Sequence, residues 1–273
     1  MKLPFRQVDV FAGAGPLSGN PLAVVHGADG LSDAQMARFA RWTNLSETTF
    51  LLPPTDPGAD YRVRIFTPTT ELPFAGHPTL GSAWAWLQAG CVPRDTGVVV
   101  QQCGVGLVRV RRDGERLAFA APPRRRSGPL DERQVERIAH ILQLPRAAIV
   151  AHQHCNNGPC WVAVMLASGK PVRALKPRFR PEDQQLELGV VGPGGDGVDF
   201  EVRAFFPGAS GMAEDPVTGS LNAALAQWLI GEGRAPTCYV AAQGSGRVHI
   251  EADGDTVWVG GAVVGCIEGQ VTW

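Results

Sequence analysis

Two segments of this chain repeat each other about half a chain length apart, and this repeat limits the possible folds more than any other feature. The first begins at Arg64 and the second at Arg203. Each reads Arg-x-Phe-x-Pro and later reaches a polar residue, Pro, two further residues and Gly-Ser; the polar residue is His77 in the first copy and Asp215 in the second. A solenoid needs shorter periods and at least three copies, so the pattern indicates one duplicated fold.

Each copy predicts a strand, a loop and a buried helix. Apolar residues of strand length surround Phe66 and Phe205, and a proline two residues later ends the strand. His77 and Asp215 each precede a proline, which the first turn of a helix tolerates, and Asp215 suits a helix N-cap. The residues that follow are apolar on every side, which is typical of a helix inside a core. We therefore expect each half to wrap a sheet around one central helix.

The starts of these two helices are candidate binding positions. They are rich in Gly, Ser and Thr, and their free N–H groups and positive dipole ends suit an anion. If the halves pack about a pseudo-two-fold axis, both starts meet in one cleft, which predicts a site for a carboxylate substrate. His77 and Asp215 take equivalent places in the repeats, so we expect both to serve this site. We expect Ser82 and Ser220 to bind an anion, because no G-x-S-x-G nucleophile motif is present.

The composition is that of an ordinary globular protein. With 273 residues, 44% apolar and 19% charged, the chain is long enough for two domains. We place them at 1–118, completed by a C-terminal strand at about 262–273, and at 119–261. The net charge of −1 gives no reason to expect nucleic acid or an anionic membrane as a partner. The start of the chain lacks an apolar signal segment, so we expect a cytoplasmic protein whose six cysteines are free, buried thiols.

Outside the repeats, hydrophobic periodicity predicts short strands and a few amphipathic helices. One helix is expected to begin at a cap formed by Ser32 and Asp33 and to continue to Trp42. Another is expected over 131–144. Strands are expected at 8–11, 22–25, 48–52, 149–150, 161–164, 186–191, 239–243, 248–251, 257–260 and 262–267.

Glu47 stands at the entrance of one of these strands, among apolar neighbours. A carboxylate that acts as a general acid or base needs partial desolvation, which raises its pKa toward the working pH, and this position is compatible with that. An ordinary surface charge is the alternative. The ligand types at His152, His154, Cys155 and Cys160 follow no standard zinc spacing, so we expect no metal. No phosphate loop, dinucleotide motif or suitably placed lysine is present, which disfavours nucleotide cofactors and pyridoxal phosphate.

Taken together, these motifs resemble the PhzF family of phenazine biosynthesis isomerases, which has the diaminopimelate epimerase fold. The matching pieces run from the N-terminus into the second half, and the length agrees over the whole chain. They are Val8-Asp-Val-Phe11 with Gly19-Asn-Pro-Leu-Ala-Val24, Asn44-Leu-Ser-Glu-Thr-Thr-Phe50, the first repeat through Gly81, and Glu214-Asp-Pro-Val-Thr-Gly-Ser220.

The resemblance implies an α+β fold of two pseudo-symmetric domains, each a mixed β-sheet curled around a central α-helix, with the active site in the cleft between them. It also implies a homodimer, no cofactor, and an isomerase that moves a proton on a small dihydroaromatic or amino carboxylic acid. By the same resemblance the general acid/base is Glu47, with His77 and Asp215 as further catalytic residues. The substrate-binding positions it implies are Ser46, Gly76, Gly219 and Ser220.

The same residues separate this chain from related epimerases and proline racemases, which use two opposed cysteines at the starts of the central helices. Here those places hold Gly76-His77 and Glu214-Asp215, so no pair of thiols is present to exchange the proton from the two faces. Two alternatives stay open: a non-catalytic protein that binds small acids, and an epimerase or lyase that uses the same Glu47. The loops at 13–18, 152–160 and 206–212 are expected to select the substrate, whose identity no local motif reveals.

Overall fold

The computed structural model describes residues 1–15, 17–195, 197–208 and 211–273. The chain forms two compact units, Met1–Ala120 together with Gly260–Trp273, and Ala121–Val259. The predicted substrate loops at 13–18 and 206–212 each include positions outside the described residues. In the part of the chain that the structure describes, no helix has both the length and the apolar character needed to cross a membrane.

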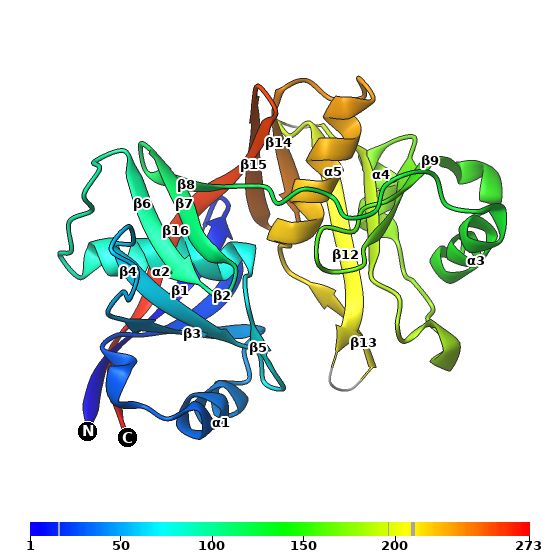
Figure 1. The fold of residues 1–273 in the computed structure, drawn as a ribbon. Coiled ribbons are helices and arrows are strands. Elements are labelled where there is room, and N and C mark those ends of the chain that lie inside the picture. The colour runs from blue at the N-terminus through cyan, green and yellow to red at the C-terminus, as the bar shows by residue number, and fades with distance from the viewer. Residues whose placement is uncertain (16, 196, 209–210) are drawn as a thin grey trace. The chain divides into compact units, whose positions relative to one another are not determined.

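Unit 1 is a mixed sheet with two helices (Figure 1). Its strands follow the order β1-β2-β3-β4-β6-β7-β8, with β16 on the other side of β1 and β5 paired to β4. The pairs β2–β3 and β4–β6 are parallel, whereas β1–β2, β3–β4, β6–β7 and β7–β8 are antiparallel. The elements are β1 (Lys2–Ala12), β2 (Asn20–Val25), α1 (Asp33–Thr43), β3 (Glu47–Leu52), β4 (Tyr61–Phe66), β5 (Glu71–Leu72), α2 (Gly76–Gln88), β6 (Val98–Cys103), β7 (Gly106–Asp113), β8 (Arg116–Ala120) and β16 (Thr256–Thr272).

Unit 2 has the same plan. Its strands follow the order β9-β10-β11-β12-β14-β15, with β13 paired to β12, and the parallel pairs are β10–β11 and β12–β14. The elements are α3 (Glu132–Leu142), β9 (Ile149–His154), β10 (Val162–Leu166), α4 (Gly169–Ala174), β11 (Leu188–Pro193), β12 (Phe200–Gly208), β13 (Gly211–Asp215), α5 (Gly219–Gly231), β14 (Cys238–Gln243) and β15 (Gly246–Asp253). The expected α+β fold, a mixed sheet with a central helix in each half, is confirmed.

The duplication extends to individual hydrogen bonds. The Asp60 backbone N–H donates to the Val100 carbonyl at 2.8 Å, and the Val100 N–H donates to the Asp60 carboxylate at 2.7 Å. Asp199 and Val240 form the same two hydrogen bonds in unit 2, both at 2.8 Å. Four residues further along the strand, each copy places an arginine over a phenylalanine ring and against a glutamate. The guanidinium groups bind the two carboxylates through two bonds of 2.6 to 2.7 Å each, in the pairs Arg64–Glu71 and Arg203–Glu214.

This register corrects the predicted equivalence of His77 and Asp215. Glu71 pairs with Phe66 on the neighbouring strand, and Glu214 pairs with Phe205. Each glutamate stands five residues before the glycine that begins its central helix, α2 at Gly76 and α5 at Gly219. The counterpart of His77 is therefore Ser220. Asp215 ends β13 and does not cap α5, whose N-cap is Thr218. The chain runs nine residues from Phe205 to its partner Glu214 but only five from Phe66 to Glu71, so the second copy reaches its helix four residues later.

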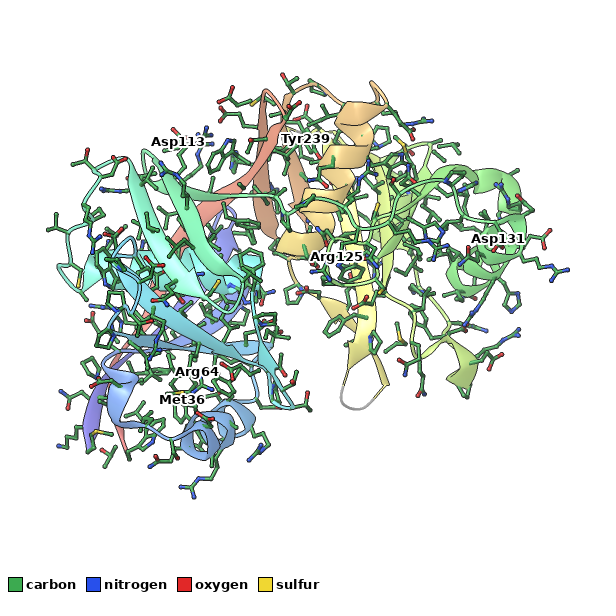
Figure 2. All side chains as sticks on the ribbon, in the orientation of Figure 1. Met36, Arg64, Asp113, Arg125, Asp131 and Tyr239 are labelled. Carbon is green, nitrogen blue, oxygen red and sulfur yellow. The ribbon has the colours of Figure 1, made fainter. Side chains whose placement is uncertain are left out.

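The two central helices are buried as predicted. Most residues of α2 and α5 are inaccessible to solvent, including the large Trp228. Gly81 shows how closely α2 approaches the sheet, since a Cβ at this position would lie 2.5 Å from the Leu22 side chain and 3.0 Å from that of Val10. The cap predicted at Ser32 is also confirmed, and Asp131, for which no cap was predicted, caps α3 in the same way. Ser32 and Asp131 each form a reciprocal capping box with a glutamine, in α1 and α3 respectively, and Figure 2 labels Asp131.

Three local predictions were wrong. The two strands expected at 257–260 and 262–267 are one strand, β16, because Gly260 and Gly261 continue the extended backbone. The strand β8 was missed within a charged segment. The six cysteines are free, but only Cys155 is buried; Cys103 is half-buried and the other four are exposed. Short strands and turns leave many positions in partial contact with solvent.

Candidate active site

Glu47 and His77, two of the predicted catalytic residues, lie together in unit 1. Glu47 is the first residue of β3, where it pairs in register with Leu22 of β2. The β-branched and apolar residues that follow bury the rest of the strand, so that Glu47 alone keeps partial access to solvent. Its Oε2 atom lies 3.4 Å from Nε2 of His77, and the two side chains are 16% and 7% exposed.

His77 owes its position to the start of α2. It is the second residue of the helix, after Gly76, and the N-cap Ala75 provides no side-chain cap. Burial lowers the pKa of the His77 imidazole from 6.5 to about 3. The ring is therefore neutral at physiological pH. A neutral imidazole beside a carboxylate can donate a hydrogen bond to the ionised acid or accept one from the protonated acid, depending on its tautomer.

The predicted binding residues of unit 1 flank this pair in the chain. Ser46 directly precedes Glu47 and is exposed, and Gly76 directly precedes His77 and is buried at the start of the helix. Ser82 does not match its prediction. Its side chain is fully buried and its hydroxyl donates to Thr49 Oγ1 at 3.0 Å, so it stabilises the packing of α2 on the sheet and is not available to an anion.

Asp215 belongs to a hydrogen-bonded network in unit 2. Its carboxylate accepts from the Thr218 hydroxyl at 2.8 Å, and its backbone carbonyl accepts from Gln243 Nε2 at 2.9 Å. The Gln243 Oε1 atom accepts in turn from the backbone N–H of Thr218 at 3.0 Å and from Asn222 at 2.9 Å. The network fixes the loop that joins β13 to α5 and holds the Asp215 carboxylate in one orientation.

The other two predicted residues of unit 2, Gly219 and Ser220, are the first two residues of α5. Two side chains that the sequence analysis did not single out contact Ser220. Trp161 Nε1 lies 3.0 Å from Ser220 Oγ, and Asn157 Nδ2 donates to the Ser220 backbone carbonyl at 2.8 Å. Both come from the segment that links β9 to β10, some 60 residues earlier in the chain. Asn157 lies in the loop at 152–160 that was expected to select the substrate, but no spacing in the sequence points to these contacts with Ser220.

The segment from His152 to Cys160 does not gather metal ligands. The described residues contain no group of three or more His, Cys, Asp or Glu side chains that could hold a metal ion. His152 instead accepts a hydrogen bond from the backbone of Leu130 at 3.0 Å, and Cys160 contacts Asn156 at 3.3 Å.

Comparisons with known proteins show which family this chain resembles. A family model described as phenazine biosynthesis-like protein matches residues 8–265. Antisense-enhancing sequence 1 of Schizosaccharomyces pombe is 35% identical, over 97% of this chain and 97% of its own length. The trans-2,3-dihydro-3-hydroxyanthranilate isomerase of Pseudomonas chlororaphis is 37% identical, over 83% of this chain and 80% of its own length.

Solved structures extend the likeness to the whole fold. A PhzF family phenazine biosynthesis protein of Enterococcus faecalis superposes with a TM-score of 0.84 at 27% identity, and each chain is covered completely. A hydroxyproline epimerase of Agrobacterium vitis shares the fold alone, with a TM-score of 0.57 at 12% identity over 99% of this chain and 92% of its own. The chain belongs to the phenazine biosynthesis-like protein family, as its motifs predicted. Several of its relatives are named isomerases, and this chain is an isomerase of that family.

Proposed function

We propose that this chain moves a proton on a small dihydroaromatic or amino carboxylic acid without a cofactor, with Glu47 as the general acid and base. The observation that carries the proposal is the contact of 3.4 Å between the half-buried Glu47 carboxylate and the buried, neutral His77 imidazole. Support for the substrate class comes from the relative in Pseudomonas chlororaphis, whose name specifies a dihydro-hydroxyanthranilate.

In the proposed reaction, Glu47 removes a proton from one carbon of the substrate and returns it to another. A carboxylate that remains partly exposed is accessible to a ligand, whereas its buried neighbour excludes water from one side. While Glu47 carries the proton, neutral His77 can accept a hydrogen bond from it, which stabilises the protonated acid between the two transfers. Because His77 is uncharged, it does not lower the proton affinity of Glu47 as a cationic ring would.

Residues of both units enter the proposal. Ser46 and Gly76 are proposed to bind the substrate from unit 1, and Gly219 and Ser220 from unit 2, where the start of α5 offers N–H groups to a carboxylate. Asp215 is proposed as a third catalytic residue. If it acts on the same substrate as Glu47, Asp215→Asn slows turnover while Thr218 and Gln243 still hold the loop.

The first test is proton NMR in D2O with trans-2,3-dihydro-3-hydroxyanthranilate. We expect the wild type to introduce deuterium at a carbon position, and Glu47→Gln to slow this by about a hundredfold or more, the usual contribution of a general base. Glu132→Gln is the matched control, because it removes an exposed carboxylate of α3 that pairs with Arg146. Equal exchange in wild type and Glu47→Gln would refute the role of Glu47.

The same experiment separates the alternatives. Binding without exchange across a panel of dihydroaromatic and amino acids would favour a small-acid binding protein. Exchange with an inverted centre would indicate an epimerase, and loss of water a lyase. The homodimer and the cytoplasmic location remain predictions, which light scattering on the purified protein and cell fractionation would test.

A further inference from the structure

The contact between Trp161 and Ser220 determines how the Ser220 hydroxyl can be used. An indole N–H donates and has no acceptor atom, so in the 3.0 Å contact Trp161 is the donor and Ser220 Oγ the acceptor. The hydroxyl's own proton is then directed to another acceptor, and none is found for it among the described residues. Trp161 is 4% exposed, which holds its ring in place. Ser220 is therefore oriented as a hydrogen-bond donor.

Asn157 places a hydrogen-bond acceptor near the same residue, Ser220. The Ser220 carbonyl can only accept, so the Asn157 atom that faces it at 2.8 Å is the amide nitrogen, and this fixes the orientation of the amide. The Asn157 Oδ1 atom is buried and has no donor within the part of the chain that the structure describes, and the residue as a whole is only 5% exposed. Buried polar oxygens ordinarily have a partner, so this oxygen is an acceptor that awaits one.

The start of α5 adds further donors. The helix spans 13 residues, and the N–H groups of its first turn have no partner within the helix. The N-cap residue Thr218 provides no side-chain cap for them. The Thr218 N–H is already bonded to Gln243. The remaining groups at this helix start are thus donors from Ser220 and the first turn, together with one buried acceptor from Asn157.

We propose that Asn157 and Trp161 complete a subsite at Ser220 that selects carboxylic acids with an amino group on the neighbouring carbon. The carboxylate accepts from the Ser220 hydroxyl and the first turn of α5, and the amino group donates to Asn157 Oδ1. Asn157 determines specificity by direct contact, whereas Trp161 is a positioning residue that acts through Ser220. The proposal rests on the proposed function, which places a small carboxylic acid at Ser220.

The test measures the affinity of stable acids by calorimetry, which requires no turnover. Anthranilate carries the carboxylate and the adjacent amino group, and 2-methylbenzoate matches its shape without the donor. We expect the wild type to prefer anthranilate by about tenfold, the usual worth of one hydrogen bond. Asn157→Leu should remove this preference and leave 2-methylbenzoate bound as before. Trp161→Phe should weaken both ligands equally, by about tenfold, and preserve the preference.

Two controls make the same chemical changes elsewhere. Gln227→Leu removes an amide on α5 that also donates to a backbone carbonyl, that of Pro122 at 3.0 Å, and Trp86→Phe removes an indole N–H from the ring stacked on Tyr61. Neither should change the preference. If Asn157→Leu does not fold, Asn157→Ala serves in its place. An unchanged preference in either Asn157 variant, or a Trp161→Phe variant that binds as the wild type does, would overturn the subsite even if Glu47-dependent exchange is observed. A lost preference without exchange would support the subsite while the isomerase proposal fails.

Discussion

At the scale of single residues, burial decides what His77 can do. An exposed histidine is half protonated near pH 6.5, but the buried ring of His77 has a pKa of about 3 and stays neutral over the range in which most enzymes work. Its partner Glu47 keeps partial exposure because it is the first residue of its strand. His77 is thus a buried neutral neighbour, and Glu47 is the partly exposed carboxylate beside it.

This burial predicts a pH dependence of stability. Because the pKa of His77 in the folded protein lies below that in the unfolded chain, the unfolded chain binds more protons in acid. The stabilisation is complete above about pH 6.5 and is lost as the pH falls toward 3, at up to about 1.4 kcal/mol per pH unit. Urea unfolding of wild type and His77→Gln at pH 4, 5, 6 and 7 tests this. We expect the variant to lose less unfolding free energy on acidification; parallel curves would contradict the assignment.

At the scale of elements, the two central helices show the same packing with different functional groups. Each begins at a glycine five residues after a glutamate that binds an arginine of the preceding strand. Figure 2 labels one of these arginines, Arg64, and also Met36 of α1. The second position of the helix is His77 in α2 and Ser220 in α5. The repeat thus places a buried imidazole at this position in one unit and a hydroxyl in the other.

The close approach of α2 to the sheet predicts an unusual effect of alanine. In most helix interiors, replacing glycine with alanine stabilises the protein by about 1 kcal/mol. At Gly81 the new Cβ would lie 2.5 Å from buried Leu22, so we expect Gly81→Ala to lower the free energy of unfolding by about 1 to 3 kcal/mol. Gly231→Ala at the end of α5 is the control, because no atom lies near its added Cβ. A higher free energy of unfolding for Gly81→Ala would contradict this prediction, because it would show that the Leu22 side chain moves aside without cost.

At the scale of the whole molecule, β16 links the two units covalently. Its first residues belong to unit 2, and from Gly260 onward the chain belongs to unit 1, where β16 pairs with β1 from Ala262 to Thr272. Val271 and Trp273 pack against the core cluster that includes Leu3, Phe39 and Phe50. The end of the chain therefore completes the fold of its beginning.

Removal of this segment should destabilise unit 1 selectively. A chain that ends at Gly261 leaves one edge of β1 without hydrogen bonds that contribute roughly 0.5 to 1.5 kcal/mol each. We expect the amide hydrogens of β1 to exchange at least about tenfold faster in hydrogen-exchange mass spectrometry. The amides of β10, inside unit 2, provide the internal reference. Unchanged protection of β1 would mean that β2 alone holds this strand.

The sequence alone determined the architecture of this protein, its family and most of its candidate residues. The repeated motif, the apolar helices after it and the capping signals depend on neighbours a few residues apart, and such local patterns are visible in a linear chain. The same patterns misplaced Asp215, because the β-hairpin before the second helix is four residues longer from Phe205 to Glu214 than from Phe66 to Glu71. They also misjudged Ser82, whose hydroxyl is turned into the core.

Only the tertiary structure decided the contacts between distant parts of the chain. Glu47 and His77 are 30 positions apart in the sequence, and Asn157 is 63 positions from Ser220, which Trp161 also contacts. The low pKa of His77 likewise depends on the residues that bury it. Such contacts follow from strand order and helix packing, which bring together side chains whose chemistry leaves no periodic mark in the sequence. Burial, hydrogen-bond direction and pKa depend on the surroundings that the folded chain creates. For this reason they could not be predicted from the sequence alone.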